Sequence, residues 1–230
     1  MGMLQILKNP KSSVSEAYRT LRTNIQFSQG DKTIKTIVIT SSGAGEGKST
    51  TCSNIATAFA QSGHKVLIID CDLRRPVQHK LFNISNEKGL THFLISSCTL
   101  NEAVKQTEIE GLHIITAGVI PPNPSELINC KRFQEYLEKL KEIYDYIFID
   151  TPPAGIVTDA QILAGKADGT VLVVNSRNTD KKAAVATKDL LDKVGAHILG
   201  VVLNKAVEDS KAYGRYYKKY YKHEYYTQGL

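Results

Sequence analysis

Residues 42–50 read SGAGEGKST and combine flexible glycines with a lysine and two hydroxyl side chains. The glycines allow backbone N–H groups to wrap a phosphate, and the positive end of a following helix would strengthen that contact. Lys48 could reach the β- and γ-phosphates of a nucleotide, and Ser49 could bind Mg²⁺. The usual leading glycine is replaced by Ser42, so the strict motif fails at one position. We predict a phosphate-binding loop formed by Gly43, Ala44, Gly45, Glu46, Gly47, Lys48, Ser49 and Thr50.

Carboxylates end two apolar runs elsewhere in the chain. Residues 66–69 lead to Asp70 and Asp72, and residues 146–149 lead to Asp150. The carboxyl ends of parallel strands meet at one edge of a sheet, where an acid can hold metal-bound water or accept a proton. Buried carboxylates without such a use would be costly. We therefore predict a catalytic group of Lys48, Asp70, Asp72 and Asp150, with Ser49, Asp70 and Asp150 at the metal.

Asn204 and Lys205 follow the last apolar run of the chain. The planar amide of Asn204 offers one donor group and one acceptor, and we predict that it reads the edge of a nucleotide base. A turn-forming asparagine followed by a solvent-facing lysine is the alternative interpretation.

Tyrosine is concentrated near the carboxyl end, where seven of the eleven tyrosines fall within residues 213–226. Six Lys/Arg and two acidic residues give residues 205–223 a net charge of +4, out of +6 for the chain. A near-neutral body with a basic tail argues against a nucleic-acid partner, which would need a basic face. The clustered tyrosines are Tyr213, Tyr216, Tyr217, Tyr220, Tyr221, Tyr225 and Tyr226.

Alternating strands and helices must position these residues. Ser13 and Glu16 have capping-box spacing and predict a helix over about 13–28. Apolar periodicity predicts strands at 36–40, 65–70, 112–116, 146–150, 170–175 and 197–203, with helices at 48–61, 125–142, 158–166 and 180–194. This order indicates an α/β fold: a single domain with a mostly parallel sheet, helices on both faces and the P-loop NTPase architecture.

Composition agrees with one compact domain followed by a tail. The 230 residues are 42% hydrophobic and 23% charged, which excludes wholesale disorder and a disulfide scaffold. We predict a domain over 1–205 and a flexible tyrosine-rich tail over 206–230. No apolar run approaches the ~18 to 20 residues needed to cross a bilayer, and no leader begins the sequence. We therefore expect a cytoplasmic chain.

Together these residues resemble the bacterial tyrosine kinases (BY-kinases) that regulate capsule and exopolysaccharide synthesis, in the split form whose catalytic domain is a separate cytoplasmic chain. The resemblance covers essentially the whole sequence. Residues 45–50 correspond to the family's Walker A motif, residues 69–74 to Walker A′ and residues 149–153 to Walker B. The resemblance extends to the segment 121–127 and to the terminal tyrosines. It also includes Glu16, Arg19 and Arg22, which match the family's E-x-x-R-x-x-R oligomerisation motif.

The resemblance implies ATP and Mg²⁺ as cofactors and autophosphorylation of the tyrosine tail. It also implies a ring-like homo-oligomer, a membrane-bound activator that recruits the chain to the inner face of the membrane through its cytoplasmic segment, a cognate phosphotyrosine phosphatase and further protein substrates. Where the family often has proline, this chain has Ala44, a change that leaves the phosphate contacts intact.

A tyrosine hydroxyl is mostly protonated at neutral pH, so its attack on a phosphate needs a base. We assign Asp72 as that base, Ser49 as a direct Mg²⁺ ligand, and Asp70 and Asp150 as holders of metal-bound water. An exchange of roles between Asp70 and Asp72 stays open. Ten residues beyond Leu203 span at most ~33 to 36 Å, so the tail could reach its own site or a neighbour's. The predicted oligomerisation stripe favours reaction between subunits.

A P-loop ATPase switch of the partition or division-site type, without kinase activity, is the alternative function. Such ATPases usually carry an additional lysine early in the P-loop, where this chain has Ser42 and Gly43, and they lack the tyrosine tail. Transfer of phosphate to the tail would distinguish a kinase from a switch, which releases only free phosphate.

Overall fold

The computed structural model describes residues 4–28 and 33–206. Its centre is a seven-stranded sheet in the order β3-β4-β2-β5-β1-β6-β7. Each neighbouring pair is parallel except β3 with β4, so the predicted mostly parallel sheet is confirmed. The strands are β1 (Thr36–Ser41), β2 (Val66–Asp70), β3 (Val104–Gln106), β4 (Leu112–Ile115), β5 (Tyr146–Asp150), β6 (Gly169–Asn175) and β7 (Ile198–Asn204).

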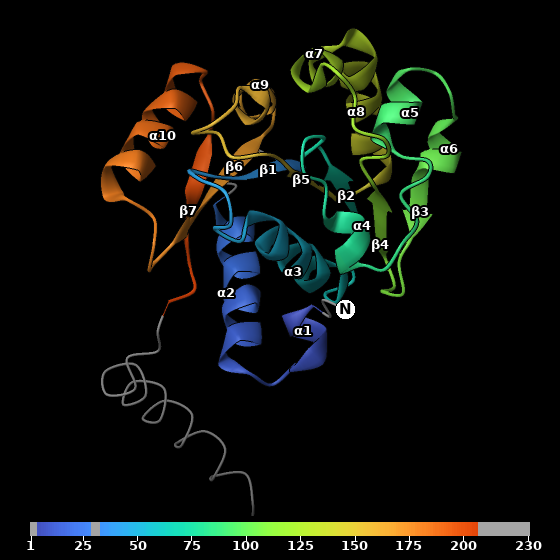
Figure 1. Cartoon of the computed structure of the whole chain (residues 1–230). Helices are drawn as coiled ribbons and strands as arrows, with labels where there is room; N and C mark the ends of the chain where they lie inside the picture. The colour runs from blue at the N-terminus through green and yellow to red at the C-terminus, as the bar shows by residue number, and fades with distance from the viewer. Residues whose placement is uncertain (1–3, 29–32, 207–230) are drawn as a thin grey trace, which may run out of the picture.

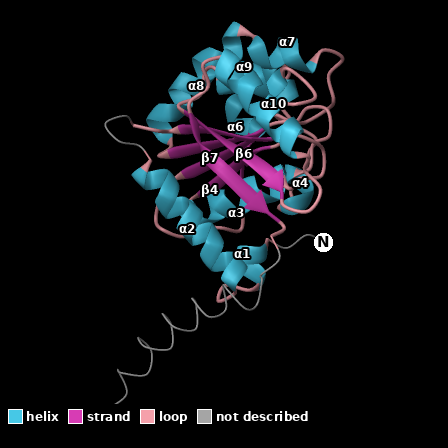
Figure 2. Ribbon diagram, turned by 90° about the vertical axis from the view of Figure 1, so that its left-hand side faces the viewer, coloured by secondary structure: helices cyan, strands magenta, loops and turns pink. Residues whose placement is uncertain are grey.

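Helices cover both faces of the sheet, as Figures 1 and 2 show. The group α1 to α3 lies on one face, and α7 to α9 lie on the other. Their bounds are α1 (Gln5–Lys8), α2 (Ser13–Phe27), α3 (Lys48–Ala60), α4 (Gln78–Leu81), α5 (Leu90–Leu94), α6 (Leu100–Ala103), α7 (Pro124–Asn129), α8 (Lys131–Ile143), α9 (Asp159–Ala164) and α10 (Lys181–Lys193).

Two hydrophobic cores result, one on each side of the sheet. In β1, Ile37 and Ile39 pack in the core that contains α3, whereas Val38 packs in the core that contains α9. All three side chains are fully buried. Burial on both faces explains why the inner strands are continuous apolar runs instead of alternating patterns.

The prediction of a single helix over 125–142 is wrong. The chain forms two helices there, α7 and α8, which are separated at Cys130. That residue has an extended backbone (φ −65°, ψ 151°) and precedes the first turn of α8. The two helices have different packing partners: α7 packs against α9, and α8 packs against β5. Helical periodicity was continuous across the break, so the change of partner had no local signal.

The long connection between β2 and β4, where a helical region is expected, also contains a strand that was not expected. It contains α4, α5 and α6, followed by β3, an edge strand of three residues that pairs antiparallel with β4. Lys105 and Gln106 make up most of β3, so no apolar run marked it as a strand.

The predicted capping box of Ser13 and Glu16 is also wrong by one residue. Ser12 is the N-cap of α2, and its hydroxyl accepts a hydrogen bond from the Ser15 backbone N–H at 3.2 Å. The helix itself forms where it was expected. Glu16 instead forms an ion pair with Arg19, with 2.8 Å between the charged atoms.

The seven clustered tyrosines from Tyr213 to Tyr226 lie outside the described residues, so the proposed tail boundary stays a prediction. Within residues 4–28 and 33–206, no helix combines the length and the apolar character needed to cross a bilayer.

Asp168 ties the beginnings of β1 and β6 together at the edge opposite the P-loop. Its Oδ2 accepts hydrogen bonds from the backbone N–H of Lys35 (3.0 Å) and of Thr36 (2.8 Å), and from the Thr36 hydroxyl (2.8 Å). Burial would raise the pKa of Asp168, but these hydrogen bonds outweigh burial and hold the pKa below its usual range. The carboxylate therefore stabilises the fold above its unfolded pKa, and this contribution is lost as the pH falls through the folded value.

We expect Asp168→Asn to lower the free energy of unfolding at pH 7 by about 1–2 kcal/mol. Denaturant unfolding at several pH values should show the difference from the parent protein shrinking below about pH 4. Asp189→Asn, at an exposed position of α10, is the matched control and should change little. A deficit that stays constant from pH 7 to pH 3 would contradict this role of the Asp168 carboxylate.

Candidate nucleotide site

The P-loop lies between β1 and α3, where the sequence predicted it. Gly45 (φ +75°) and Gly47 (φ +96°) adopt left-handed backbone conformations, which glycine reaches without strain. A Cβ atom at Gly47 would lie only 2.0 Å from Nδ2 of Asn204. The backbone angle therefore favours glycine at residue 47, a Cβ atom there would displace the Asn204 amide, and α3 begins at Lys48.

The Glu46 side chain stabilises the conformation of this loop through hydrogen bonds. Its carboxylate is buried and accepts a hydrogen bond from the Ser42 backbone N–H at 3.0 Å and one from the Thr179 hydroxyl at 2.6 Å. The loop is thereby fastened to the segment after β6. Ser42, the departure from the usual motif, contributes its backbone N–H, while its buried hydroxyl has no hydrogen-bond partner among the described residues.

The sheet order brings the predicted carboxylates beside the P-loop. Strand β5 lies between β2 and β1, and Asp70 stands opposite Asp150 in register. The Lys48 Nζ lies 2.7 Å from Asp72 Oδ2 and 3.8 Å from Asp150 Oδ1. The same Nζ donates to the Ser49 hydroxyl at 3.1 Å. Residues predicted from separate motifs thus meet in one cluster.

Burial and mutual repulsion dominate the electrostatics of this cluster. Burial raises the pKa of Asp70 well above its usual range, and the charge of Asp150 raises it further. Burial also raises the pKa of Asp150, although Lys48 acts in the opposite direction. For Lys48, burial alone would lower the pKa, but Asp150 and Asp72 outweigh it and raise the pKa. Lys48 is therefore charged, and it is a close cationic partner of these acids.

Gln78, at the start of α4, connects the parts of the cluster and was not predicted. Its Nε2 donates to Asp150 Oδ2 at 2.8 Å and to the Ser49 carbonyl at 3.2 Å. Its Oε1 accepts from the Ser53 hydroxyl at 2.7 Å, and its backbone N–H donates to Asp70 Oδ2 at 3.1 Å. The glutamine belongs to no recognisable motif, so no signal in the sequence could have identified it.

We expect Gln78→Leu to lower the free energy of unfolding by about 2–4 kcal/mol, because it leaves several buried polar atoms without a partner. Affinity for ADP should also fall, since Ser49 and Asp150 lose their common tether. Calorimetric unfolding and ADP titration measure the two effects. The matched control is Gln134→Leu, at an exposed position of α8; an equal loss in both variants would contradict the assigned role.

A second unpredicted contact fixes the segment after β2. The Arg74 guanidinium binds the buried Asp159 carboxylate through two hydrogen bonds, of 2.9 and 3.0 Å. Asp159 is the first residue of α9, so this bidentate pair joins the Walker A′ region to the opposite side of the site. Nothing in the local sequence of either residue indicated the pairing.

The acid cluster has the donor groups that Mg²⁺ prefers. Asp150 Oδ1 is buried and lacks a hydrogen-bond partner among the described residues. This buried carboxylate oxygen, which lies 3.8 Å from the Lys48 ammonium and near the hydroxyl-bearing Ser49, suits a hard cation with oxygen ligands. Both oxygens of Asp70 already accept backbone N–H groups, from Asp72 at 3.2 Å and from Gln78 at 3.1 Å, which suits its predicted role of holding metal-bound water instead of the metal itself. The residues present therefore fit the metal.

Asn204 lies against the P-loop at the end of β7. Its Nδ2 donates to the Glu46 carbonyl at 2.9 Å, and its Oδ1 accepts from the Lys205 backbone N–H at 2.8 Å. Recognition of a base by this amide stays a prediction. Lys205 is not a free surface lysine, because its Nζ donates to the Gly45 carbonyl at 2.9 Å.

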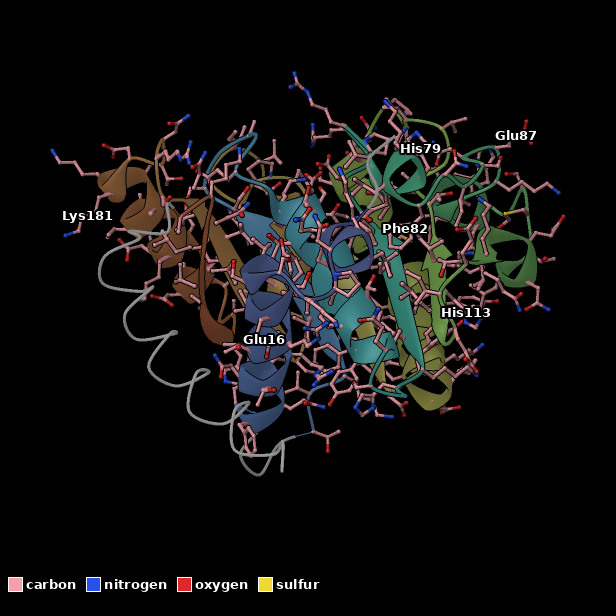
Figure 3. All side chains as sticks on the ribbon, turned by 90° about the horizontal axis from the view of Figure 1, so that it is seen from below. Glu16, His79, Phe82, Glu87, His113 and Lys181 are labelled. Atoms are coloured by element: carbon pink, nitrogen blue, oxygen red, sulfur yellow. The ribbon has the colours of Figure 1, made fainter. Side chains whose placement is uncertain are left out.

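The predicted oligomerisation residues all lie on α2, and Figure 3 shows Glu16 on this helix in the view from below. Arg19 binds Glu16 and also donates to the Pro10 carbonyl at 2.7 Å. Arg22 donates to the Ala58 carbonyl at 3.0 Å, near the end of α3. These contacts are within the chain, and a contribution of the stripe to assembly stays a prediction.

Comparison with known proteins identifies the family. The family model described as "AAA domain" matches residues 34–196. The tyrosine-protein kinase YwqD of Bacillus subtilis (strain 168) is 44% identical over 211 residues, which cover 91% of this chain and 89% of that protein.

Two solved structures are similar in sequence and in shape. The chimerical protein CapA2B2 is 44% identical with a TM-score of 0.86, covering 89% of this chain and 90% of that chain. The kinase domain of Escherichia coli tyrosine kinase ETK is 33% identical with a TM-score of 0.87, covering 92% of this chain and 84% of that chain. With its P-loop, its paired carboxylates and these relatives, the chain belongs to the bacterial tyrosine kinases with a P-loop fold.

Proposed function

We propose that this chain is an ATP-dependent protein tyrosine kinase that phosphorylates its own C-terminal tyrosine cluster and thereby regulates capsule or exopolysaccharide synthesis. The observation that carries the proposal is the contact between Lys48 and Asp72 at the mouth of the P-loop, 2.7 Å between charged atoms. This contact supports the proposal because an ammonium that could bind phosphates lies beside a carboxylate that could accept the proton of a phenol. Residues 1–205 are the kinase unit in this proposal, and residues 206–230 carry the acceptors.

The two groups work in sequence. In the structure, Asp72 Oδ2 accepts from Lys48 and Asp72 Oδ1 accepts from the Arg75 backbone N–H at 2.9 Å. When Lys48 turns to the β- and γ-phosphates, Asp72 Oδ2 loses its ammonium partner and becomes able to accept the proton of an entering tyrosine hydroxyl. Asp70 is less suited to be the base, because both of its oxygens are occupied by backbone N–H groups.

The remaining residues position the phosphates and the metal. Backbone N–H groups of the P-loop hold the phosphate oxygens, and Lys48 neutralises charge that develops during transfer. Ser49, Asp70 and Asp150 would hold Mg²⁺, which when bound supplies further positive charge at the phosphates. Gln78 keeps Ser49 and Asp150 in place through its hydrogen bonds to both.

The proposal includes assembly and recruitment. A ring-like homo-oligomer would use Glu16, Arg19 and Arg22, a membrane-bound activator would bring the chain to the membrane, and a phosphotyrosine phosphatase would reverse the modification. The presence of the three motif residues on one helix supports the oligomer, and the family resemblance supports the activator and the phosphatase.

Mass spectrometry of the purified chain after incubation with ATP and Mg²⁺ tests the function. We expect phosphate on the seven tail tyrosines from Tyr213 to Tyr226, none in a variant with all seven replaced by phenylalanine, and full labelling of the control Tyr136→Phe in α8. Release of free phosphate without modified tyrosine would overturn the proposal in favour of a P-loop ATPase switch.

A further inference from the structure

Two residues at the end of β7 donate side-chain hydrogen bonds to two backbone carbonyls of the P-loop. Lys205 Nζ donates to the Gly45 carbonyl at 2.9 Å, and Asn204 Nδ2 donates to the Glu46 carbonyl at 2.9 Å. These carbonyls belong to successive peptide groups of the loop. We name the pair Asn204 and Lys205 the carbonyl clasp.

The clasp acts on the loop's N–H groups, because a trans peptide group is planar and its C=O and N–H point in opposite directions. Holding the Gly45 carbonyl outward directs the N–H of Glu46 inward, and holding the Glu46 carbonyl outward directs the N–H of Gly47 inward. No cis peptide bond interrupts the described residues. The clasp thus orients two N–H groups of the predicted phosphate cradle without any contact to the nucleotide itself.

Further hydrogen bonds hold the backbone of both clasp residues and the Asn204 amide. The Asn204 amide is oriented because its Oδ1 accepts the Lys205 backbone N–H at 2.8 Å. The Asn204 carbonyl accepts the Ser176 N–H at 2.9 Å, and the Lys205 carbonyl accepts Arg177 Nε at 3.2 Å. Lys205 also has a left-handed backbone (φ +55°), unfavourable for a residue with a Cβ atom. Such a conformation persists only where its surroundings enforce it.

We propose that Asn204 and Lys205 are positioning residues that preorganise the P-loop for phosphate binding. This inference rests on the proposed function in one respect, since it takes residues 43–50 as the phosphate cradle. It differs from recognition of a base by Asn204, because both amide atoms are used in ordering the loop and the following residue. The ligand affected is any nucleoside di- or triphosphate, through its phosphates.

Titration of the purified chain with ADP tests the clasp. We expect Lys205→Met to weaken ADP binding about fivefold, since a charged hydrogen bond to the Gly45 carbonyl is lost. Lys205→Arg retains a cationic donor and should remain within about twofold of the parent. Lys193→Met, at an exposed position of α10, is the control and should bind ADP as the parent does.

Lys205→Gly separates positioning from general stability. Glycine accepts the left-handed conformation without strain, so the nucleotide-free variant should melt no lower than the parent, while ADP binding should weaken as in Lys205→Met. If Lys205 served only the stability of the fold, its substitution would lower the melting temperature and the ADP affinity together, or would lower neither. If Lys205→Gly and Lys205→Met bind ADP as tightly as a parent protein that does bind it, the clasp is refuted and the proposed function stands. If the parent binds neither ADP nor ATP, both are refuted.

Discussion

Lys48→Met should lower the rate of tail phosphorylation by about 10²- to 10³-fold. Methionine keeps the length and the apolar stem of lysine but removes the charge. Two effects combine: the phosphates lose a cation, and Asp72 and Asp150 lose the ammonium that lies 2.7 and 3.8 Å from their oxygens. Quantitative mass spectrometry of the tail over time measures the rate, and ADP titration should show weakened binding as well.

The matched control is Lys88→Met. Lys88 also forms an ion pair, with Glu102, but it is an exposed lysine, and we expect its loss to leave phosphorylation near the parent rate. Tail phosphorylation by Lys48→Met at the parent rate would contradict the placement of Lys48 at the phosphates.

The same variant distinguishes reaction within a chain from reaction between chains. Lys48→Met has acceptor tyrosines but an impaired site, whereas the variant with seven phenylalanines has an intact site but no acceptors. If reaction occurs between subunits, mixing the two should restore phosphate to the tail of Lys48→Met. A mixture that remains as slow as Lys48→Met alone would show that each chain modifies itself.

Asp72→Asn has the second large expected effect, a fall in phosphorylation rate of about 10²- to 10⁴-fold. Asparagine keeps the shape of the side chain and can still accept from the Arg75 N–H, so the fold should be retained. Its neutral amide cannot take the proton of a tyrosine hydroxyl. We therefore expect ADP affinity to change little while the transfer rate collapses, unlike Lys48→Met, where both fall.

Asp70→Asn is the comparison that separates the two acids of Walker A′. Since both oxygens of Asp70 accept backbone N–H groups, this change should disturb the loop and metal binding, with a loss that added Mg²⁺ partly reverses. The Asp72→Asn defect should not respond to Mg²⁺. Phosphate transfer at the parent rate in Asp72→Asn would refute the role of Asp72 as the base. A loss of transfer in Asp70→Asn that added Mg²⁺ does not reverse would instead indicate that Asp70 is the base.

Much of the site could be predicted because its parts have local signatures. Residues 42–50 carry glycines at the spacing typical of a phosphate-binding loop, and Asp70 and Asp150 each end an apolar strand. The rule that parallel strands expose their carboxyl ends at one edge was enough to bring these segments together. Pairing of Asp70 with Asp150 in register is the consequence in the structure.

Other features were hidden because they depend on what a segment packs against. The break at Cys130 separates two helices with different packing partners, although helical periodicity continues across it. Strand β3 forms because β4 offers a free edge, while its own residues are mostly polar. In both cases the deciding free energy comes from a neighbour that is distant in the chain.

The amino-acid sequence alone determined the fold class, the phosphate loop and the acids, since these follow from short-range spacing and strand ends. Only the tertiary structure decided which groups hold them in place. Gln78 binds a carboxylate 72 residues further along, and Lys205 binds a carbonyl 160 residues before it. Such contacts need a single polar group at each end, which in the second case is a backbone carbonyl, and no pattern around it. The two residues of each contact meet only in the folded chain, so the spacing of residues in the sequence does not predict the contact.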